Sequence, residues 1–180
     1  DVSSEMRFKA KALNFGVLYG MGARGFARAS SISFQEAQNF IDQYFLRFPG
    51  ILKYMEETKE FARKHGYVET MFGRKRFLPD VNSPTPQIRA AAERMAINHP
   101  SQGTAADIMK MAMVQVQERV LHSNSACAML LQVHDELLLE CRETEAQELI
   151  LPIKKAMEEV VLFDPLLLVK VSQGTSWADL

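Results

Sequence analysis

Two carboxylates stand side by side in the segment QVHDELLLE, between two runs of apolar residues. Because burying Asp135 and Glu136 without a cation would be costly, we expect them at an exposed turn or beside positive charge. Carboxylate oxygens are good ligands for Mg²⁺. Adjacent strand residues point to opposite faces, so at most one of the two binds a metal directly unless the backbone turns there. An ordinary polar hairpin turn is the alternative interpretation.

A second pattern lies in RFKAKALNFGVLYG, where Arg7, Lys11, Phe15 and Tyr19 recur every four residues. Residues at this spacing share one face of a helix. Two cations one turn apart can hold phosphates of a nucleoside triphosphate through charge-assisted hydrogen bonds. The two rings that follow can pack on a sugar and stack near a base. Alternatively, Phe15 and Tyr19 are core residues with two extended cations beside them.

A third pattern places Arg94, Asn98 and Gln102 on one helical face among small residues. A cation and two amides can contact phosphates, sugars and base edges in a minor groove. A solvated helix face is the alternative interpretation of these three residues.

Composition allows one ordinary domain or two small lobes, since the 180 residues are 47% apolar and 24% charged. No apolar run approaches the roughly 18 residues of a membrane span, and no signal-peptide pattern is present. We therefore expect a cytoplasmic protein without membrane contact. The chain begins without Met, and we expect it to be a piece of a longer protein.

Charge is distributed unevenly along the sequence. Residues 1–94 carry 15 Lys and Arg against 10 Asp and Glu, a net of +5, whereas residues 95–180 carry 6 against 12, a net of −6. This is expected if the first half handles polyanions and the second gathers metal-binding carboxylates. Two solvated surfaces of opposite charge explain it equally well.

Periodicity predicts helices for most of the first half. They cover about 3–20, 23–30, 34–48 with a Ser33–Glu36 capping box, and 51–65 before Gly66. A small hairpin is expected around Phe72–Gly73. A long helix is predicted from about 87 to 122, interrupted and kinked at HPSQG by Pro100.

The last third predicts strands at CAMLLQV and ELLLEC, a helix that bends or restarts at Pro152, and a third strand within PLLLVKVSQGTSWADL. Cys127 and Cys141 are placed symmetrically about His134, so a hairpin there would bring them close across two strands. A crosslink is conceivable, but in a reducing cytosol we expect two buried thiols.

Three segments together carry a family resemblance. RFKAKALNFGVLYG, AAAERMAINHPSQGTAADI and QVHDELLLE resemble consecutive motifs of the family A DNA polymerases, the bacterial DNA polymerase I type. The resemblance extends from about Glu5 to Trp177. It implies an α+β fragment of a right-hand polymerase, with residues 1–88 as the helical fingers lobe and 89–180 as the C-terminal part of the palm, where antiparallel strands pack with helices.

The resemblance also implies roles for the residues of the first pattern. Arg7 and Lys11 would bind the incoming dNTP, with Lys11 counted among the catalytic residues. Phe15 would pack against the sugar, and Tyr19 would sit beside the templating base. A Phe at position 15 implies discrimination against dideoxynucleotides.

The remaining implied roles concern DNA and metal. Asp135 would be a catalytic Mg²⁺ ligand in a two-metal nucleotidyl transfer, with Glu136 as its acidic neighbour. Contacts to the primer–template DNA would come from Arg94, Asn98, Gln102 and His134. The expected activity is DNA-directed DNA polymerase, in DNA replication and repair.

The family needs a second catalytic Asp from a palm strand upstream of the nucleotide-binding helix, and this sequence holds no replacement. We therefore expect the chain to be inactive alone, with the upstream palm and thumb of the same polymerase as its missing partners. The alternative is a non-catalytic DNA- or nucleotide-binding module derived from a polymerase. A two-metal nuclease built on Asp135 and Glu136 is a third possibility, although a second carboxylate site for it is not evident.

Overall fold

The chain divides into two units, Asp1–Gly103 and Thr104–Leu180. The structure is a computed structural model that describes residues 3–122 and 126–179. The predicted functional boundary at 88/89 remains a prediction.

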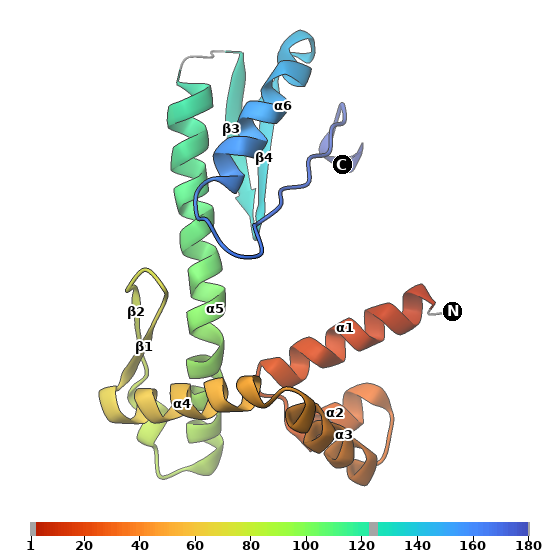
Figure 1. The fold of residues 1–180 in the computed structure, drawn as a ribbon, viewed down its shortest axis with the longest axis vertical. Helices are drawn as coiled ribbons and strands as arrows, with labels where there is room; N and C mark the ends of the chain where they lie inside the picture. Colours follow the sequence, from red (N-terminus) through yellow and green to blue (C-terminus); the bar gives the residue numbers. More distant parts are fainter. Residues whose placement is uncertain (1–2, 123–125, 180) are drawn as a thin grey trace. The chain divides into compact units, whose positions relative to one another are not determined.

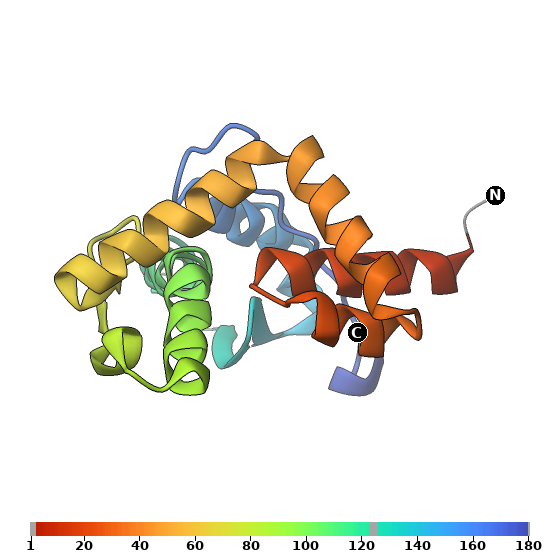
Figure 2. The ribbon, with the colours of Figure 1, turned by 90° about the horizontal axis from the view of Figure 1, so that it is seen from below.

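The first unit is mostly helical (Figure 1). Helix α1 packs on α2, and α2 packs on α3 (Figure 2). Short breaks separate the helices because Gly22, Ser33 and Phe48 flank their ends. The elements in order are α1 (Ser4–Leu18), α2 (Ala23–Ser30), α3 (Phe34–Arg47), α4 (Pro49–His65), β1 (Tyr67–Glu69), β2 (Lys75–Phe77), the 3₁₀ helix η1 (Pro79–Asn82) and α5 (Pro86–Val116), which continues beyond this unit.

Local signals at helix ends behave as predicted. The Ser33 hydroxyl accepts from the Glu36 amide at 3.2 Å, and the Glu36 carboxylate accepts from the Ser33 amide at 2.9 Å. This capping box satisfies backbone donors at the start of α3. The same hydrogen bonds lower the pKa of the Glu36 carboxyl. Gly66 ends α4 with φ +75°, a left-handed conformation that costs glycine little.

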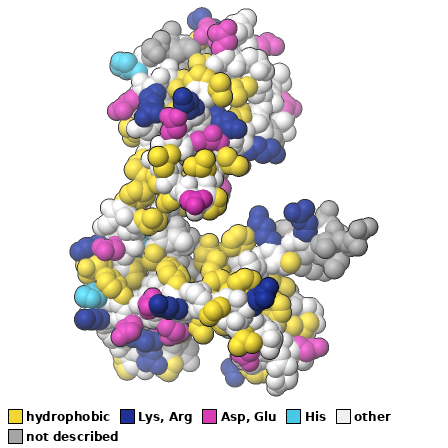
Figure 3. All heavy atoms as spheres, viewed as in Figure 1, with side chains coloured by type: hydrophobic (Ala, Val, Ile, Leu, Met, Phe, Trp, Pro, Cys, Tyr) yellow, Lys and Arg dark blue, Asp and Glu magenta, His cyan; other side chains and the backbone are white. Residues whose placement is uncertain are grey.

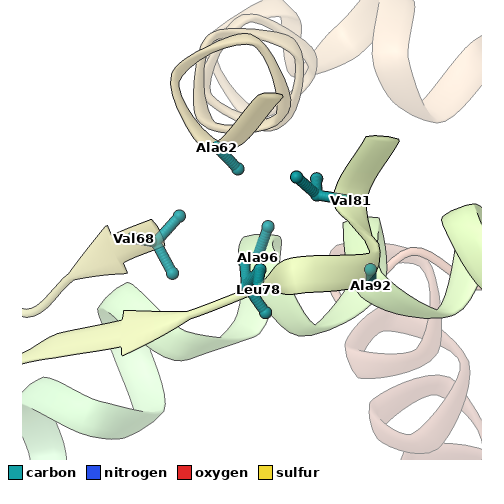
Figure 4. Packing of buried hydrophobic residues seen from close by; sticks show 6 residues of the cluster. All are labelled: Ala62, Val68, Leu78, Val81, Ala92 and Ala96. Atoms are coloured by element: carbon teal, nitrogen blue, oxygen red, sulfur yellow. The ribbon is translucent and has the colours of Figure 1, made fainter. Parts of the chain in front are cut away.

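Two buried clusters hold the first unit together. One joins α1, α2 and α3 through Val17, Ala23, Phe26, Ala37 and Ile41. The other joins α4, the β1–β2 hairpin, η1 and α5, and its side chains point toward one another in Figure 4: Ala62, Val68, Leu78, Val81, Ala92 and Ala96. Small residues on α5 let the hairpin and α4 approach this helix closely.

Helix α5 runs through HPSQG without a break, so the predicted interruption is wrong. Pro100 removes one backbone donor, but its neighbours Ala96, Ile97 and His99 are buried. Their packing outweighs the loss of one hydrogen bond.

The second unit pairs β3 (Cys127–Val133) with β4 (Glu136–Cys141) as an antiparallel hairpin, with an irregularity between Met129 and Leu131. Helix α6 (Glu143–Glu158) and the π-helical turn η2 (Gln117–Leu121) pack with this hairpin around a shared apolar cluster. Both strands were predicted with these bounds. Helix α6 does not restart at Pro152, because this residue is exposed and water can satisfy the carbonyl it leaves.

The predicted third strand is wrong: residues 165–176 contain no strand. Leu166 and Leu168 are 63% and 84% exposed, so the apolar run that suggested a strand is not buried, and it pairs with neither β3 nor β4. A 3₁₀ turn, η3 (Trp177–Asp179), follows. None of the helices within 3–122 and 126–179 is long and apolar enough to cross a membrane.

Cys127 and Cys141 form a disulfide, so the prediction of two free thiols is wrong. The register places the two residues directly opposite each other, with their Cα atoms 4.1 Å apart. This closeness follows from the hairpin that the symmetric spacing predicted.

Candidate functional site

The residues Arg7, Lys11, Phe15 and Tyr19 form a stripe along α1 that is mostly exposed to solvent. Arg7 and Lys11 are exposed, Phe15 is 41% exposed, and Tyr19 is half-buried just after the helix ends. Figure 3 shows dark blue cationic side chains on this part of the surface. Phe15 is therefore not a core residue, so the alternative interpretation of Phe15 as part of the core is wrong.

The stripe residues also contact one another. The Lys11 Nζ atom lies 5.9 Å from the centroid of the Phe15 ring, within cation–π range. The rings of Phe15 and Tyr19 lie 6.0 Å apart with an interplanar angle of 16°. A cationic end thus leads into two roughly parallel rings, a surface suited to a phosphate joined to a flat group.

The opposite face of α1 fixes this orientation. Val17 is fully buried and packs with Leu13 into the cluster around Phe26. Residues two apart on a helix differ by about 200°, so burying Leu13 and Val17 directs Phe15 outward.

The end of α1 meets the start of α5 at Gly20. Gly20 has φ +82°, and a Cβ there would lie 3.2 Å from Cγ of Arg94 and 3.6 Å from Cδ1 of Ile97. A cavity of about 300 Å³ lies beside this contact. Its lining includes Val17, Gly20, Met21, Ile41, Met55 and Arg94.

Arg94, Asn98 and Gln102 form a second stripe, on α5, whose two end residues are more exposed than the middle one. Arg94 and Gln102 are exposed, whereas Asn98 is half-buried. The Asn98 Oδ1 atom is buried and has no hydrogen-bond partner among the described residues. This oxygen is shielded from the surface, so a ligand does not reach it in this structure, and the DNA contact of Asn98 remains a prediction.

Sequence reasoning missed Tyr54 on α4. Its hydroxyl donates to the Ile97 carbonyl at 2.9 Å. Burial raises the pKa of Tyr54, a hydrogen bond with Thr58 opposes that shift, and nearby Tyr19 raises the pKa further. No local pattern could reveal Tyr54, because its partner lies 43 residues away.

His134 and Asp135 form the two-residue turn between β3 and β4, and Glu136 opens β4 opposite Val133. His134 has φ +53°, a conformation common in the tight turns of hairpins. All three side chains are exposed, as predicted for unpaired carboxylates. The backbone turns at Asp135, which lifts the opposite-face restriction expected for a straight strand.

Within the described residues, no group of three or more His, Cys, Asp or Glu side chains could hold a metal ion. Asp135 and Glu136 thus offer hard oxygen ligands, the kind that Mg²⁺ prefers, but not a complete ligand set in that part of the chain.

The fold is that of a polymerase-domain segment. The structure resembles the POL domain of Pol1 from M. smegmatis, solved in complex with DNA primer-template and dNTP, with a TM-score of 0.86 and 42% identity. The match covers 91% of this chain and 29% of that one. The model of DNA polymerase family A matches residues 1–179, and the chain belongs to this family.

Individual relatives agree with the family assignment. The chain is 47% identical to DNA polymerase I of Pseudomonas aeruginosa over 177 residues, which is 98% of this chain and 19% of the relative. It is 48% identical to the thermostable DNA polymerase I of Thermus thermophilus over 172 residues, 96% of this chain and 20% of the relative. The chain therefore spans about a fifth of the length of these relatives.

Proposed function

We propose that this chain is part of a DNA-directed DNA polymerase that serves DNA replication and repair. Residues 1–88 would belong to the fingers and 89–180 to the palm. The observation that carries the proposal is the stripe of α1, in which Arg7, Lys11 and Phe15 are exposed while Leu13 and Val17 on the opposite face pack into the core. Membership of DNA polymerase family A supplies the reaction class.

In this proposal the α1 stripe binds the incoming dNTP. Arg7 and Lys11 hold its phosphates by charge-assisted hydrogen bonds, and Lys11 also stabilises negative charge that develops during transfer. The exposed Phe15 ring packs on the sugar, and Tyr19 lies beside the templating base. Their spacing along one face matches the order phosphate, sugar, base.

Primer–template DNA would be contacted by the second stripe and the hairpin turn. Arg94 would contact phosphate or sugar, while the amides of Asn98 and Gln102 would form hydrogen bonds with base edges in the minor groove. His134, exposed at the turn, would contact the primer end.

Asp135 would hold magnesium, with Glu136 as a second nearby carboxylate. When bound, the metal would neutralise triphosphate charge and lower the pKa of the primer 3′-hydroxyl. The chain's own contribution is to present these carboxylates at a turn with their oxygens exposed. Further ligands would come from an upstream palm strand, so we expect the 180 residues alone to be inactive.

Primer extension tests the proposal. The purified 180-residue chain, with magnesium and four dNTPs, should give no templated product. A chimera with residues 1–180 in place of the aligned segment of the Pseudomonas aeruginosa enzyme should extend primers. Extension by the isolated chain would refute the need for an upstream strand. A folded chimera that binds DNA in a salt-dependent way but never extends it would instead favour a non-catalytic binding module.

A further inference from the structure

The turn of α5 that contains Pro100 is held from outside by two side chains. Tyr54 on α4 donates to the Ile97 carbonyl at 2.9 Å, and Arg74 in the β1–β2 hairpin donates from Nη2 to the Gly103 carbonyl at 2.9 Å. The two carbonyls lie about 9 Å apart along the helix at 1.5 Å per residue. They bracket Asn98 and Gln102.

This turn needs outside support because Pro100 has no N–H to donate to the Ala96 carbonyl. A helix that has lost one hydrogen bond bends more easily at that point. A bend there would move Asn98 and Gln102 relative to Arg94. External donors at both ends of the turn oppose that movement.

The hairpin that carries Arg74 is built to approach α5 closely. A Cβ on Gly103 would lie 2.7 Å from Cγ2 of Thr70 and 3.0 Å from Cε1 of His99, so only glycine fits without displacement. Nε2 of the buried His99 also lies 3.4 Å from the Arg74 carbonyl. The helix and the hairpin are therefore in contact on both sides of the Arg74 hydrogen bond.

Thr70 makes the hairpin turn rigid. It is 4% exposed, and its hydroxyl accepts from the amides of Phe72 and Arg74 at 3.3 and 3.1 Å. Its own amide donates to the Arg74 carbonyl at 3.0 Å. The backbone of Arg74 is therefore held by hydrogen bonds at both its amide and its carbonyl.

We propose that Tyr54 and Arg74 are positioning residues that fix the Pro100 turn of α5 and so aim Asn98 and Gln102 at the minor groove of the primer–template. This inference rests on the proposed function, because it assumes that the α5 stripe contacts DNA. Tyr54 and Arg74 lie outside the three segments that resemble family motifs. The β1–β2 hairpin would influence DNA binding indirectly, through α5, without contacting DNA itself.

The test uses Tyr54→Phe, which removes only a hydroxyl, and Arg74→Lys, which keeps the charge but not the planar fork. Both are made in the polymerase chimera, with Tyr67→Phe and Arg47→Lys as matched controls. Tyr67 contacts its neighbours through its ring, and Arg47 is exposed at the end of α3. Thermal unfolding confirms that each variant is folded, and Tyr54→Phe decides alone if Arg74→Lys is not.

We expect each test variant to weaken primer–template binding about threefold to tenfold, the range for one hydrogen bond, with the dNTP KM within about twofold of the unaltered chimera. The decisive measurement uses a primer whose terminal base lacks its minor-groove acceptor. In the unaltered chimera, this base change should lower DNA affinity by removing a hydrogen bond to an amide. The loss of affinity should be smaller in both test variants, because their displaced amides no longer make that bond, and it should be unchanged in both controls.

Two results overturn the inference separately. Unchanged DNA affinity and an unchanged penalty in an active chimera refute the positioning role and leave the proposed function standing. An unaltered chimera that is folded and extends no primer refutes the proposed function, and the positioning role with it.

Discussion

Gly20 and Arg94 lie so close together that a Cβ on Gly20 would be 3.2 Å from Cγ of Arg94. This close approach joins the end of the α1 stripe to the beginning of the α5 stripe. One end of the stripe proposed to bind dNTP therefore lies beside Arg94, the first residue of the α5 stripe proposed to contact DNA, within the first unit. A change at Gly20 should affect both.

Gly20→Ala should destabilise the first unit by about 1–2 kcal/mol, because alanine at φ +82° is strained and its methyl group presses on Arg94. Urea unfolding measures the loss. Gly50→Ala is the matched control, since nothing lies within 4 Å of a Cβ there and its φ is not in the left-handed region. Equal stability of the two variants would contradict the packing described for Gly20.

Lys11→Ala should raise the dNTP KM of the chimera about 10- to 100-fold, the range expected for the loss of one hydrogen bond to a charged group. Lys11 is exposed, so the unfolding midpoint should stay unchanged. Lys53→Ala removes an exposed cation that pairs with Glu57 at 3.7 Å and should leave KM unaffected. Steady-state incorporation of a single dNTP provides the measurement.

Asp135→Ala should lower turnover of the chimera by at least about a thousandfold, because a metal ligand contributes several kcal/mol to charge stabilisation. The residue is exposed in a turn, so folding should be preserved. Glu140→Gln removes a charge from an exposed position in the same hairpin and serves as the control. Normal turnover by the Asp135 variant would refute its assignment as a metal ligand.

Tyr54→Phe should reduce stability at neutral pH by about 0.5–1.5 kcal/mol through the lost bond to the Ile97 carbonyl. Burial raises the pKa of Tyr54 above its ordinary value of 10.0. The protonated form is therefore favoured by folding, and its contribution is complete below pH 10 and lost as the pH rises through the folded pKa. The stability difference between wild type and variant should shrink above pH 10. A constant difference from pH 7 to 11 would contradict the raised pKa.

Reduction of the Cys127–Cys141 bond should lower the stability of the second unit by about 3 kcal/mol, the chain-entropy value for a loop of about 15 residues. The two cysteines are 14 residues apart in sequence. Intact mass with and without reductant reports the bond, and thermal unfolding reports its effect. A chain purified without reductant and already carrying two free thiols would refute the disulfide.

Local rules predicted much of the fold. The bounds of α2, β3 and β4 and the Ser33–Glu36 capping box follow from residue spacing and end signals. The same rules failed at two prolines that lie inside continuous helices. Packing holds α5 together around Pro100, whereas Pro152 is exposed and water can satisfy the carbonyl it leaves. They also failed for the C-terminal segment, because strand formation depends on a partner edge that apolar residues alone do not supply.

The sequence by itself determined which residues share a face, since helical and strand periods depend only on the nearest turns of the chain. It therefore placed Arg7, Lys11, Phe15 and Tyr19 in one line and Asp135 beside a turn. Only the tertiary structure decided which face of α1 is buried and that Gly20 meets Arg94. It also decided that Tyr54 and Arg74 hold the Pro100 turn, because these contacts join residues 29 to 74 positions apart in sequence, and no local period encodes a contact over that distance.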